Sequence, residues 1–384
     1  MKPASESKLV PGCACVVAAG STPRDSRQAS TARLLFRPCG SSSFGKPAYR
    51  SASSKLSSVR KLFAILFLLL AAVAGWLTFN IYVPVTPAGQ RFVMLRPGYS
   101  TRRIARELKN AGVIRSFDAF VVWHALHKKP SLKAGEYLFE HGANVRDIHS
   151  RLARGDIYVH TVVIPEGFNM FDIANAVQAA GLGPATDFLK VATTETNLIS
   201  DLAPHATSLE GYLFPNTYNF TRTQTMREMA AEMVKQFRQV AAQVGLSNQI
   251  QQTVTLASIV EKETGVAEER PRVASVYTNR LAQHIPLQAD PSVIYAELLS
   301  GTYGGALHHN DMQFDSAYNT YRHAGLPPGP IANPGRTSIE AALHPAQTNY
   351  LYFVADGNGH HKFATTLEEH NKNVAAFRRT LANR

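Results

Sequence analysis

An uncharged apolar run from Leu62 to Val83 is the feature that most restricts how this chain can fold. The run is long enough to cross a bilayer as one helix, so a membrane would separate the residues before it from those after it. Arg60 and Lys61 precede the run, and the positive-inside rule therefore predicts a cytoplasmic N-terminus and an exported remainder. A cleaved signal peptide is the alternative, but the preceding segment is long for one and no small-x-small cleavage site follows Trp76. We therefore expect an uncleaved transmembrane helix over residues 62–83.

The basic charge of the chain is concentrated before this run. The formal net charge is +12, and residues 1–61 contain 11 Lys and Arg against 2 Asp and Glu. This tail is rich in Ser, Ala, Arg and Pro without sustained periodicity, so we expect residues 1–61 to be a cytoplasmic tail, disordered up to residue 58, that contacts anionic lipid. The nearly neutral remainder shows no basic-aromatic face, and nucleic acid is not expected as a partner.

All three cysteines, Cys13, Cys15 and Cys39, lie in the tail. An exported part without cysteine fits a domain that is large enough to fold without disulfides. The Cys-x-Cys pair and the adjacent histidines His308-His309 and His360-His361 lack the spacing of a metal site. We therefore expect neither a metal ion nor another cofactor.

A repeat with an offset of 69 residues follows the apolar run. Its two copies begin at Val93 and Val162, each reads as a short strand, a Gly turn and an amphipathic helix, and six positions are identical. A shorter third copy begins at Tyr137. Such units need partners to bury their apolar faces, so residues 88–158 are expected to form one small α+β module. The build is similar to that of LysM glycan-binding modules, although a packing module that only spaces the next domain from the membrane is an open alternative.

Residues 160–384 are expected to form one larger domain, which makes the exported part α+β overall. We expect helices over residues 225–244 and 272–281 and a last helix that starts at the capping box Thr366 to Glu369. Tyr350 to Val354 reads as a buried strand that a Gly-rich turn connects to His361 to Phe363.

The segment from Ser247 to Gly265 reads as one helix, capped by Ser247 and Asn248, with two carboxylates at its end. At about 100° per residue, Glu263 shares a stripe with Leu256, Ile259 and Val260, whereas Glu261 lies on nearly the opposite face. Burial on the apolar stripe would raise the pKa of a carboxyl group and keep it protonated, as a general acid requires. Glu263 is therefore the candidate catalytic acid, against the simpler interpretation of a solvated glutamate at a helix end.

Two further segments carry candidate substrate-binding residues. Gln288 and Asp290 precede a helix that starts at Pro291, where Asp290 also suits the role of an N-cap. Asn319 and Tyr321 stand in the motif Tyr-Asn-Thr-Tyr, and amide and phenol groups suit sugar hydroxyls and N-acetyl groups, although aromatic side chains are as often part of a core. The sequence contains no phosphate loop, nucleophile elbow or His-Glu-x-x-His motif.

Together these motifs resemble those of the MltG (YceG-like) endolytic murein transglycosylases. The resemblance covers the apolar run through the C-terminus, without the tail, and rests on five motifs that occur in order. They are Ala-Ser-Ile-Val-Glu-Lys-Glu-Thr at 257–264, Leu-Gln-Ala-Asp-Pro at 287–291, Tyr-Asn-Thr-Tyr at 318–321, Gly-Leu-Pro-Pro-Gly at 325–329 and Tyr-Phe-Val-Ala-Asp-Gly at 352–357. The family often has Ser or Thr where Ala289 stands.

The resemblance implies a membrane-anchored α+β protein with a LysM-like module and a larger mixed α/β YceG-like catalytic domain. It implies an inner-membrane enzyme with a periplasmic catalytic domain that cuts nascent peptidoglycan strands between N-acetylmuramic acid and N-acetylglucosamine and leaves 1,6-anhydro ends. The family's catalytic glutamate corresponds to Glu263, and a peptidoglycan synthase is expected as a partner by analogy. A muramidase that hydrolyses the same bond and a non-catalytic wall-binding scaffold are the alternatives.

Overall fold

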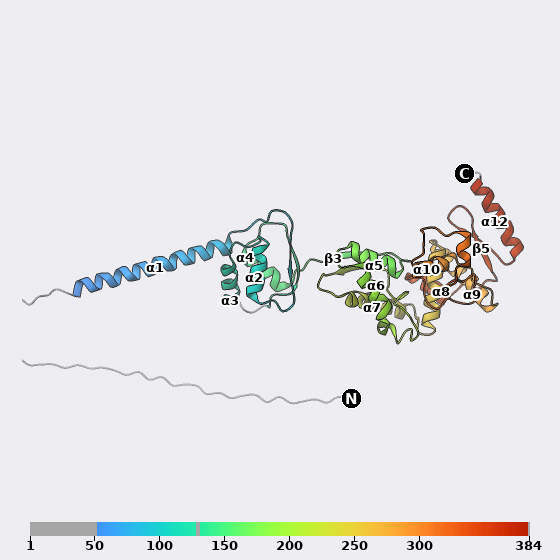
Figure 1. The fold of residues 1–384 in the computed structure, drawn as a ribbon, viewed down its shortest axis with the longest axis horizontal. Coiled ribbons are helices and arrows are strands. Elements are labelled where there is room, and N and C mark those ends of the chain that lie inside the picture. The colour runs from blue at the N-terminus through green and yellow to red at the C-terminus, as the bar shows by residue number, and fades with distance from the viewer. Residues whose placement is uncertain (1–51, 128–130, 383–384) are drawn as a thin grey trace, which may run out of the picture. The chain divides into compact units, whose positions relative to one another are not determined.

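The computed structural model of this chain describes residues 52–127 and 131–382 as a mixed α+β protein (Figure 1). Its strands form three separate antiparallel pairs, β1 with β2, β3 with β4 and β5 with β6. The first of the helices is α1 (Ala52–Tyr82). The other elements, in chain order, are β1 (Arg91–Leu95), α2 (Thr101–Asn110), α3 (Phe117–Leu126), β2 (Gly135–Phe139), α4 (Val145–Arg154), β3 (His160–Ile164), α5 (Met170–Ala179), α6 (Ala185–Thr194), η1 (Thr196–Ile199), β4 (Asn216–Phe220), α7 (Met226–Gln243), α8 (Ile250–Glu263), η2 (Ala267–Glu269), α9 (Arg270–Ala282), α10 (Asp290–Ser300), η3 (His309–Gln313), α11 (Arg336–Leu343), β5 (Tyr352–Ala355), β6 (His361–Ala364) and α12 (Leu367–Ala382).

Helix α1 contains the apolar run expected to cross a membrane. By length and composition its segment Ser58–Tyr82 qualifies as a membrane span, and the side chains of the apolar window are exposed. These features fit a single-pass anchor or a signal sequence. The helix begins at Ala52, so the expectation of disorder up to residue 58 is wrong for 52–58, because a helix once nucleated extends at low cost into adjoining polar residues. Most of the tail over 1–61, with its three cysteines, lies outside the described residues.

The 69-residue repeat is confirmed at the level of secondary structure. Its copies are β1 followed by α2, and β3 followed by α5. Gly98 and Gly167 turn the two copies at φ values of +83° and +77°, a left-handed conformation that favours glycine. Side chains of Ser100 and Asn169 then cap the two helices by accepting hydrogen bonds from backbone N–H groups. The third copy is β2 followed by α4.

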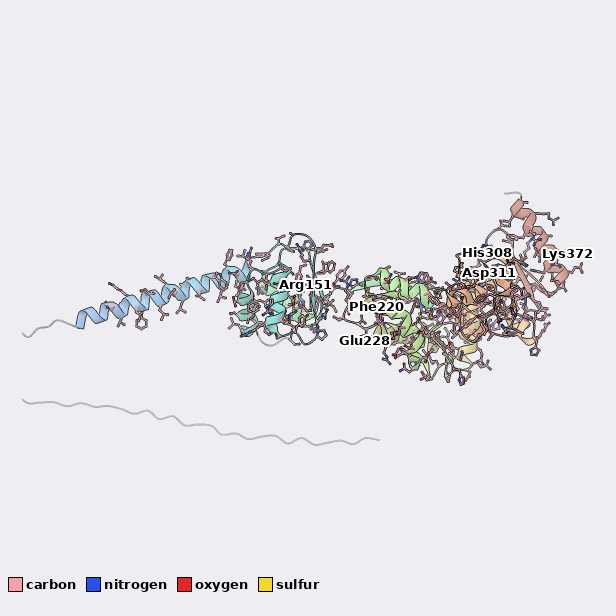
Figure 2. The ribbon with its side chains drawn as sticks, viewed as in Figure 1. Arg151, Phe220, Glu228, His308, Asp311 and Lys372 are labelled. Carbon is pink, nitrogen blue, oxygen red and sulfur yellow. The ribbon has the colours of Figure 1, made fainter. Side chains whose placement is uncertain are left out.

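Buried side chains form three apolar clusters. The first is built by β1, β2 and α2 to α4, with Leu108 and Tyr137 fully buried. The second is built by β3, β4 and α5 to α7 and includes Phe220, which Figure 2 labels on β4. The third joins α8, α9, α10 and α11. The elements from β1 to α4 share one apolar cluster, as a folding module over residues 88–158 requires. The residue limits of the domains remain a prediction.

The helices predicted after residue 220 are present. Helix α7 starts at the capping box formed by Thr225 and Glu228, the latter labelled in Figure 2. Helix α9 covers the predicted segment 272–281, and α12 starts directly after Thr366, whose hydroxyl accepts a hydrogen bond from the Glu369 N–H. The predicted hairpin is also present as β5 and β6, but the strand expected to be buried is only partly buried at each of its residues.

Candidate active site

Helix α8 is central to the third cluster, where it packs against α9, α10 and α11. Every residue from Val254 to Val260 is buried, so the helix is covered on all sides. Leu256, Ile259 and Val260 on the apolar stripe are buried, but so are the other faces of the helix, because neighbouring helices cover them as well. The expected caps are also wrong: the N-cap is Gln249, in the left-handed conformation, without a side-chain cap.

Glu261, the first of the two carboxylates at the end of α8, has a side chain that is only 5% exposed. One oxygen accepts a hydrogen bond from Arg270 Nη2 at 2.9 Å, and the other accepts one from the Gly335 N–H at 2.9 Å. The guanidinium of Arg270 is 9% exposed, so the pair is a buried ion pair. Both oxygens of Glu261 are thus engaged in holding α8 to α9 and to the start of α11.

Glu263 lies two residues further on, in a half-buried position with different partners. Its Oε1 accepts a hydrogen bond from the phenol of Tyr277 on α9 at 2.8 Å. Among the described residues, Glu263 has no ion pair with Lys, Arg or His. Burial raises the pKa of Glu263 to about 7, the Tyr277 hydrogen bond opposes that rise, Asp290 adds to it and Arg280 opposes it. A carboxyl group with a pKa of about 7 is suited to give and take a proton near neutral pH.

Asp290 and Tyr321 lie at this site as a hydrogen-bonded pair. The Tyr321 hydroxyl donates to Asp290 Oδ1. The charge of Asp290 raises the pKa of Glu263, and the charge of Glu263 in turn raises the pKa of Tyr321. The interpretation of Asp290 as an N-cap is wrong, because Ala289 is the N-cap of α10 and Asp290 is its first helical residue. The Thr320 hydroxyl instead accepts a hydrogen bond from the Ala289 N–H at 2.9 Å, which leaves the Asp290 carboxylate exposed beside Tyr321.

Gln288 and Asn319 differ in their exposure. Gln288 is exposed and has a left-handed backbone with φ +53°, which a residue other than glycine adopts only at some cost in energy. Asn319 is fully buried, and its Nδ2 donates to the carbonyls of Met312 and Phe314. Its Oδ1 accepts from the Tyr321 N–H at 3.0 Å. The amide of Asn319 therefore fixes the loop that presents Tyr321, while Gln288 is the amide that is accessible from solvent.

Three residues of the site region were not among the predicted candidates. Tyr277 and Arg280 lie one turn apart on the buried face of α9, and a phenol or a guanidinium in an apolar face is a sequence signal that it has a buried partner. The third is Glu210, which is 1% exposed and accepts hydrogen bonds from the Met170 N–H at 2.9 Å and Asn333 Nδ2 at 2.7 Å. Burial raises the pKa of Glu210 to about 8.

Within the described ranges 52–127 and 131–382, no group of three or more His, Cys, Asp or Glu side chains is placed to hold a metal ion. His308 Nδ1 lies 3.4 Å from Asp311 Oδ2 at the start of η3, and Figure 2 labels both residues. His360 and His361 both approach Glu269, and His361 Nδ1 lies 2.7 Å from Glu269 Oε2. His308 thus has Asp311 as its carboxylate partner, and His360 and His361 share Glu269.

The model of the YceG-like family matches residues 93–376. The chain belongs to the YceG-like family. All five residues predicted for the site fall within the matched range.

Three relatives give the range of similarity. An endolytic murein transglycosylase of Bacillus subtilis (strain 168) is 34% identical over 295 residues, which cover 72% of this chain and 81% of that protein. An endolytic murein transglycosylase of Streptococcus pneumoniae serotype 2 (strain D39 / NCTC 7466) is 29% identical over 357 residues, or 81% of this chain and 64% of that protein. A crystal structure of a yceG-like protein from Listeria monocytogenes is 33% identical, with a TM-score of 0.49, and covers 74% of this chain and 98% of that chain.

Proposed function

We propose that this member of the YceG-like family is an endolytic murein transglycosylase. It would cut nascent peptidoglycan strands at the bond between N-acetylmuramic acid and N-acetylglucosamine and leave 1,6-anhydro ends that terminate elongation. The observation that carries the proposal is Glu263, a carboxyl group with a pKa raised to about 7 and a phenol donor at 2.8 Å. The names of the relatives that match most of this chain support the same activity.

The reaction requires one acid that acts twice. Protonated Glu263 donates its proton to the glycosidic oxygen, and the bond from that oxygen to C1 of the muramyl sugar breaks. The Glu263 carboxylate then removes the proton of the muramyl 6-hydroxyl, whose oxygen bonds to C1 and closes the anhydro ring. The cycle adds no water and returns Glu263 to its protonated form. Asp290 lies where its negative charge would stabilise the positive charge that develops at C1, and Gln288 is exposed where it would bind the sugar.

Asp290 is also the reason to keep a muramidase as the second candidate. A hydrolase needs a second carboxylate as nucleophile or as the base that activates water, and the charge of Asp290 acts on Glu263. Hydrogen bonding from Tyr321 to Asp290 holds that carboxylate in place. Its geometry therefore suits either reaction, and only the product distinguishes them.

The masses of the products test the proposed reaction. The full-length chain in detergent is incubated with peptidoglycan sacculi, and the released fragments are analysed by mass spectrometry. Transglycosylation gives anhydro-ended fragments that are lighter by one water than the products of hydrolysis. We expect anhydro ends within glycan strands. Reducing ends alone would establish a muramidase, and no release from any strand would favour the non-catalytic scaffold.

The pH dependence is a second expected result. Because the acid must be protonated in free enzyme, kcat/KM is expected to fall as pH rises through about 7. In Tyr277→Phe the carboxylate loses its phenol donor, so the pKa of Glu263 rises and the alkaline limb moves up by roughly one pH unit. Initial rates between pH 5 and 9 measure both effects. An unchanged alkaline limb in Tyr277→Phe would show that another group titrates.

We further propose a cellular location and binding partners for the enzyme. Helix α1 would anchor it in the inner membrane, with the N-terminus cytoplasmic and the catalytic part periplasmic. The elements from β1 to α4 would serve as the LysM-like glycan-binding module, since they share one apolar cluster. A peptidoglycan synthase as partner rests on the analogy with the family. The anchor, the module and the partner would restrict cleavage to glycan strands near the membrane.

A further inference from the structure

Arg280 is a buried cation on α9 that links two backbone segments near the site. The residue is 8% exposed. Its Nη1 donates to the carbonyls of Pro286 at 3.2 Å and Leu287 at 2.8 Å, and its Nε donates to the carbonyl of Leu351 at 2.7 Å. The guanidinium also lies over the ring of Tyr352, 5.1 Å from the centroid. All of its hydrogen bonds in the described residues thus go to backbone carbonyls.

This arrangement is unusual for a buried guanidinium, because no carboxylate in the described residues forms an ion pair with it. Burying a charge without an opposite charge is costly, and carbonyl dipoles compensate only part of that cost. The ionisable groups whose charges act on Arg280 are Tyr277 on the same helix, Tyr352 on β5, Tyr321 in the 318–321 loop and Glu263 at the end of α8. His370 on α12 is affected by the charge of Arg280 in turn. Glu263 is the only carboxyl group in this set.

We propose that Arg280 is a positioning residue for cleavage of the glycosidic bond. Its guanidinium clamps the turn leading to Asp290 and supplies the countercharge for the Glu263 carboxylate. The inference rests on the proposed function, because the carboxylate exists only after Glu263 has donated its proton. It assigns Arg280 no contact with the substrate.

The clamp follows from the chain order at the turn. The carbonyls of Pro286 and Leu287 directly precede Gln288, whose left-handed backbone is strained, and Asp290 follows two residues later. A strained turn persists only when its surroundings fix it. The two carbonyl contacts of one guanidinium fix this turn to α9, the helix that also carries Tyr277. The turn before Asp290 is thereby held against the helix that carries the donor to Glu263.

The countercharge follows from the change of charge during the reaction. When protonated Glu263 donates its proton, a negative charge appears in a half-buried site where the effective dielectric constant is low. Asp290, itself negative, disfavours that charge, whereas Arg280 favours it. The cation therefore makes Glu263 a stronger acid for the first step and stabilises the carboxylate until it removes the proton of the 6-hydroxyl.

Two substitutions separate the two roles. Arg280→Gln removes the charge, so the alkaline limb of kcat/KM is expected to move up by about one pH unit and kcat to fall by roughly ten-fold. Arg280→Lys keeps the charge, so its alkaline limb of kcat/KM is expected to coincide with that of the wild type. The ammonium lacks the planar fork of a guanidinium and cannot reproduce the carbonyl contacts in both segments, so KM is expected to rise. Rates on peptidoglycan are measured with the full-length chain in detergent between pH 5 and 9.

Arg272→Gln is the matched control. It removes the same charge from the same helix, but the Arg272 side chain is 45% exposed and lies 3.9 Å from Glu269 and over the ring of Phe363. We expect the alkaline limb of this control to coincide with that of the wild type.

The outcomes distinguish the inference from the proposed function. If Arg280→Gln is less active with an unmoved alkaline limb, Arg280 is only structural and the inference is overturned. If Arg280→Gln does not fold, Arg280→Lys decides alone: a shifted limb despite the retained charge, or an unchanged KM, contradicts the inference. Full activity of Glu263→Gln would instead overturn the proposed function, whatever the Arg280 variants show.

Discussion

Glu263→Gln is expected to abolish the release of anhydro-ended fragments, with a loss of at least about 10³-fold in kcat. The amide has nearly the shape of the carboxyl group and accepts the same hydrogen bond from Tyr277, but it has no proton to donate to the glycosidic oxygen. The loss is large because one residue serves both proton transfers, so neither step retains its catalyst. Mass spectrometry of sacculus digests with the purified full-length variant measures the remaining turnover.

The fold of Glu263→Gln should remain intact. Burial raises the pKa of Glu263 to about 7, so a neutral amide removes a destabilisation that grows as pH rises above the usual glutamate pKa and is complete above about pH 7. Thermal unfolding followed by circular dichroism should therefore give a Tm equal to that of the wild type or higher. Retained turnover would show that a different group, Asp290 being the nearest candidate, provides the proton.

Glu261→Gln is expected to have the opposite signature, a loss of stability with little change in chemistry. The variant removes the closer and buried carboxylate partner of Arg270, whose side chain is 9% exposed, and leaves only the exposed Glu166 carboxylate, 3.8 Å from Nη1. Breaking a buried ion pair by removing one partner costs about 3 to 5 kcal/mol in the free energy of unfolding. The turnover of the molecules that remain folded should stay within a few-fold of the wild type, since Glu261 is fully engaged with Arg270 and Gly335.

Urea unfolding of the single variants and of the double variant Glu261→Gln, Arg270→Met tests this assignment. If the ion pair is the source of the effect, the two single losses will not add in the double variant, because the second substitution no longer breaks the pair. The contrary result is a Glu261→Gln protein that is as stable as the wild type and as inactive as Glu263→Gln, which would exchange the roles of the two glutamates.

Features that depend on near neighbours in the chain were predictable from the sequence. The strand, Gly turn and helix of the repeat were predicted because the turn needs a left-handed residue and the helix an N-cap, and both are local. The start of the last helix after Thr366 was predicted for the same reason. The caps predicted at Ser247 and Asn248 were wrong, because the chain enters α8 through a left-handed residue, Gln249, that the cap pattern does not reveal.

The roles of the other site residues depended on hydrogen bonds that form only on folding, either between distant segments or within one loop. The sequence allowed Asp290 to be interpreted as an N-cap. In the structure Ala289 is the N-cap, and its N–H donates to the hydroxyl of Thr320, thirty positions after Asp290. Asn319 has an amide side chain of the kind that binds sugars, yet this amide is buried and forms hydrogen bonds with backbone groups of its own loop. Neither arrangement leaves a trace in residue type or spacing, because the partners are fixed by tertiary packing.

The sequence by itself determined the apolar run, the repeat, the family and the pair of carboxylates at the end of one helix. Only the tertiary structure decided what distinguishes the two, because its helices bury α8 on all sides and remove the difference between its faces. Arg270 then keeps Glu261 in an ion pair, while Glu263 meets a neutral phenol from α9 and the charge of Asp290. Desolvation and nearby charge set the pKa of a carboxyl group, and both come from residues that are brought together by folding.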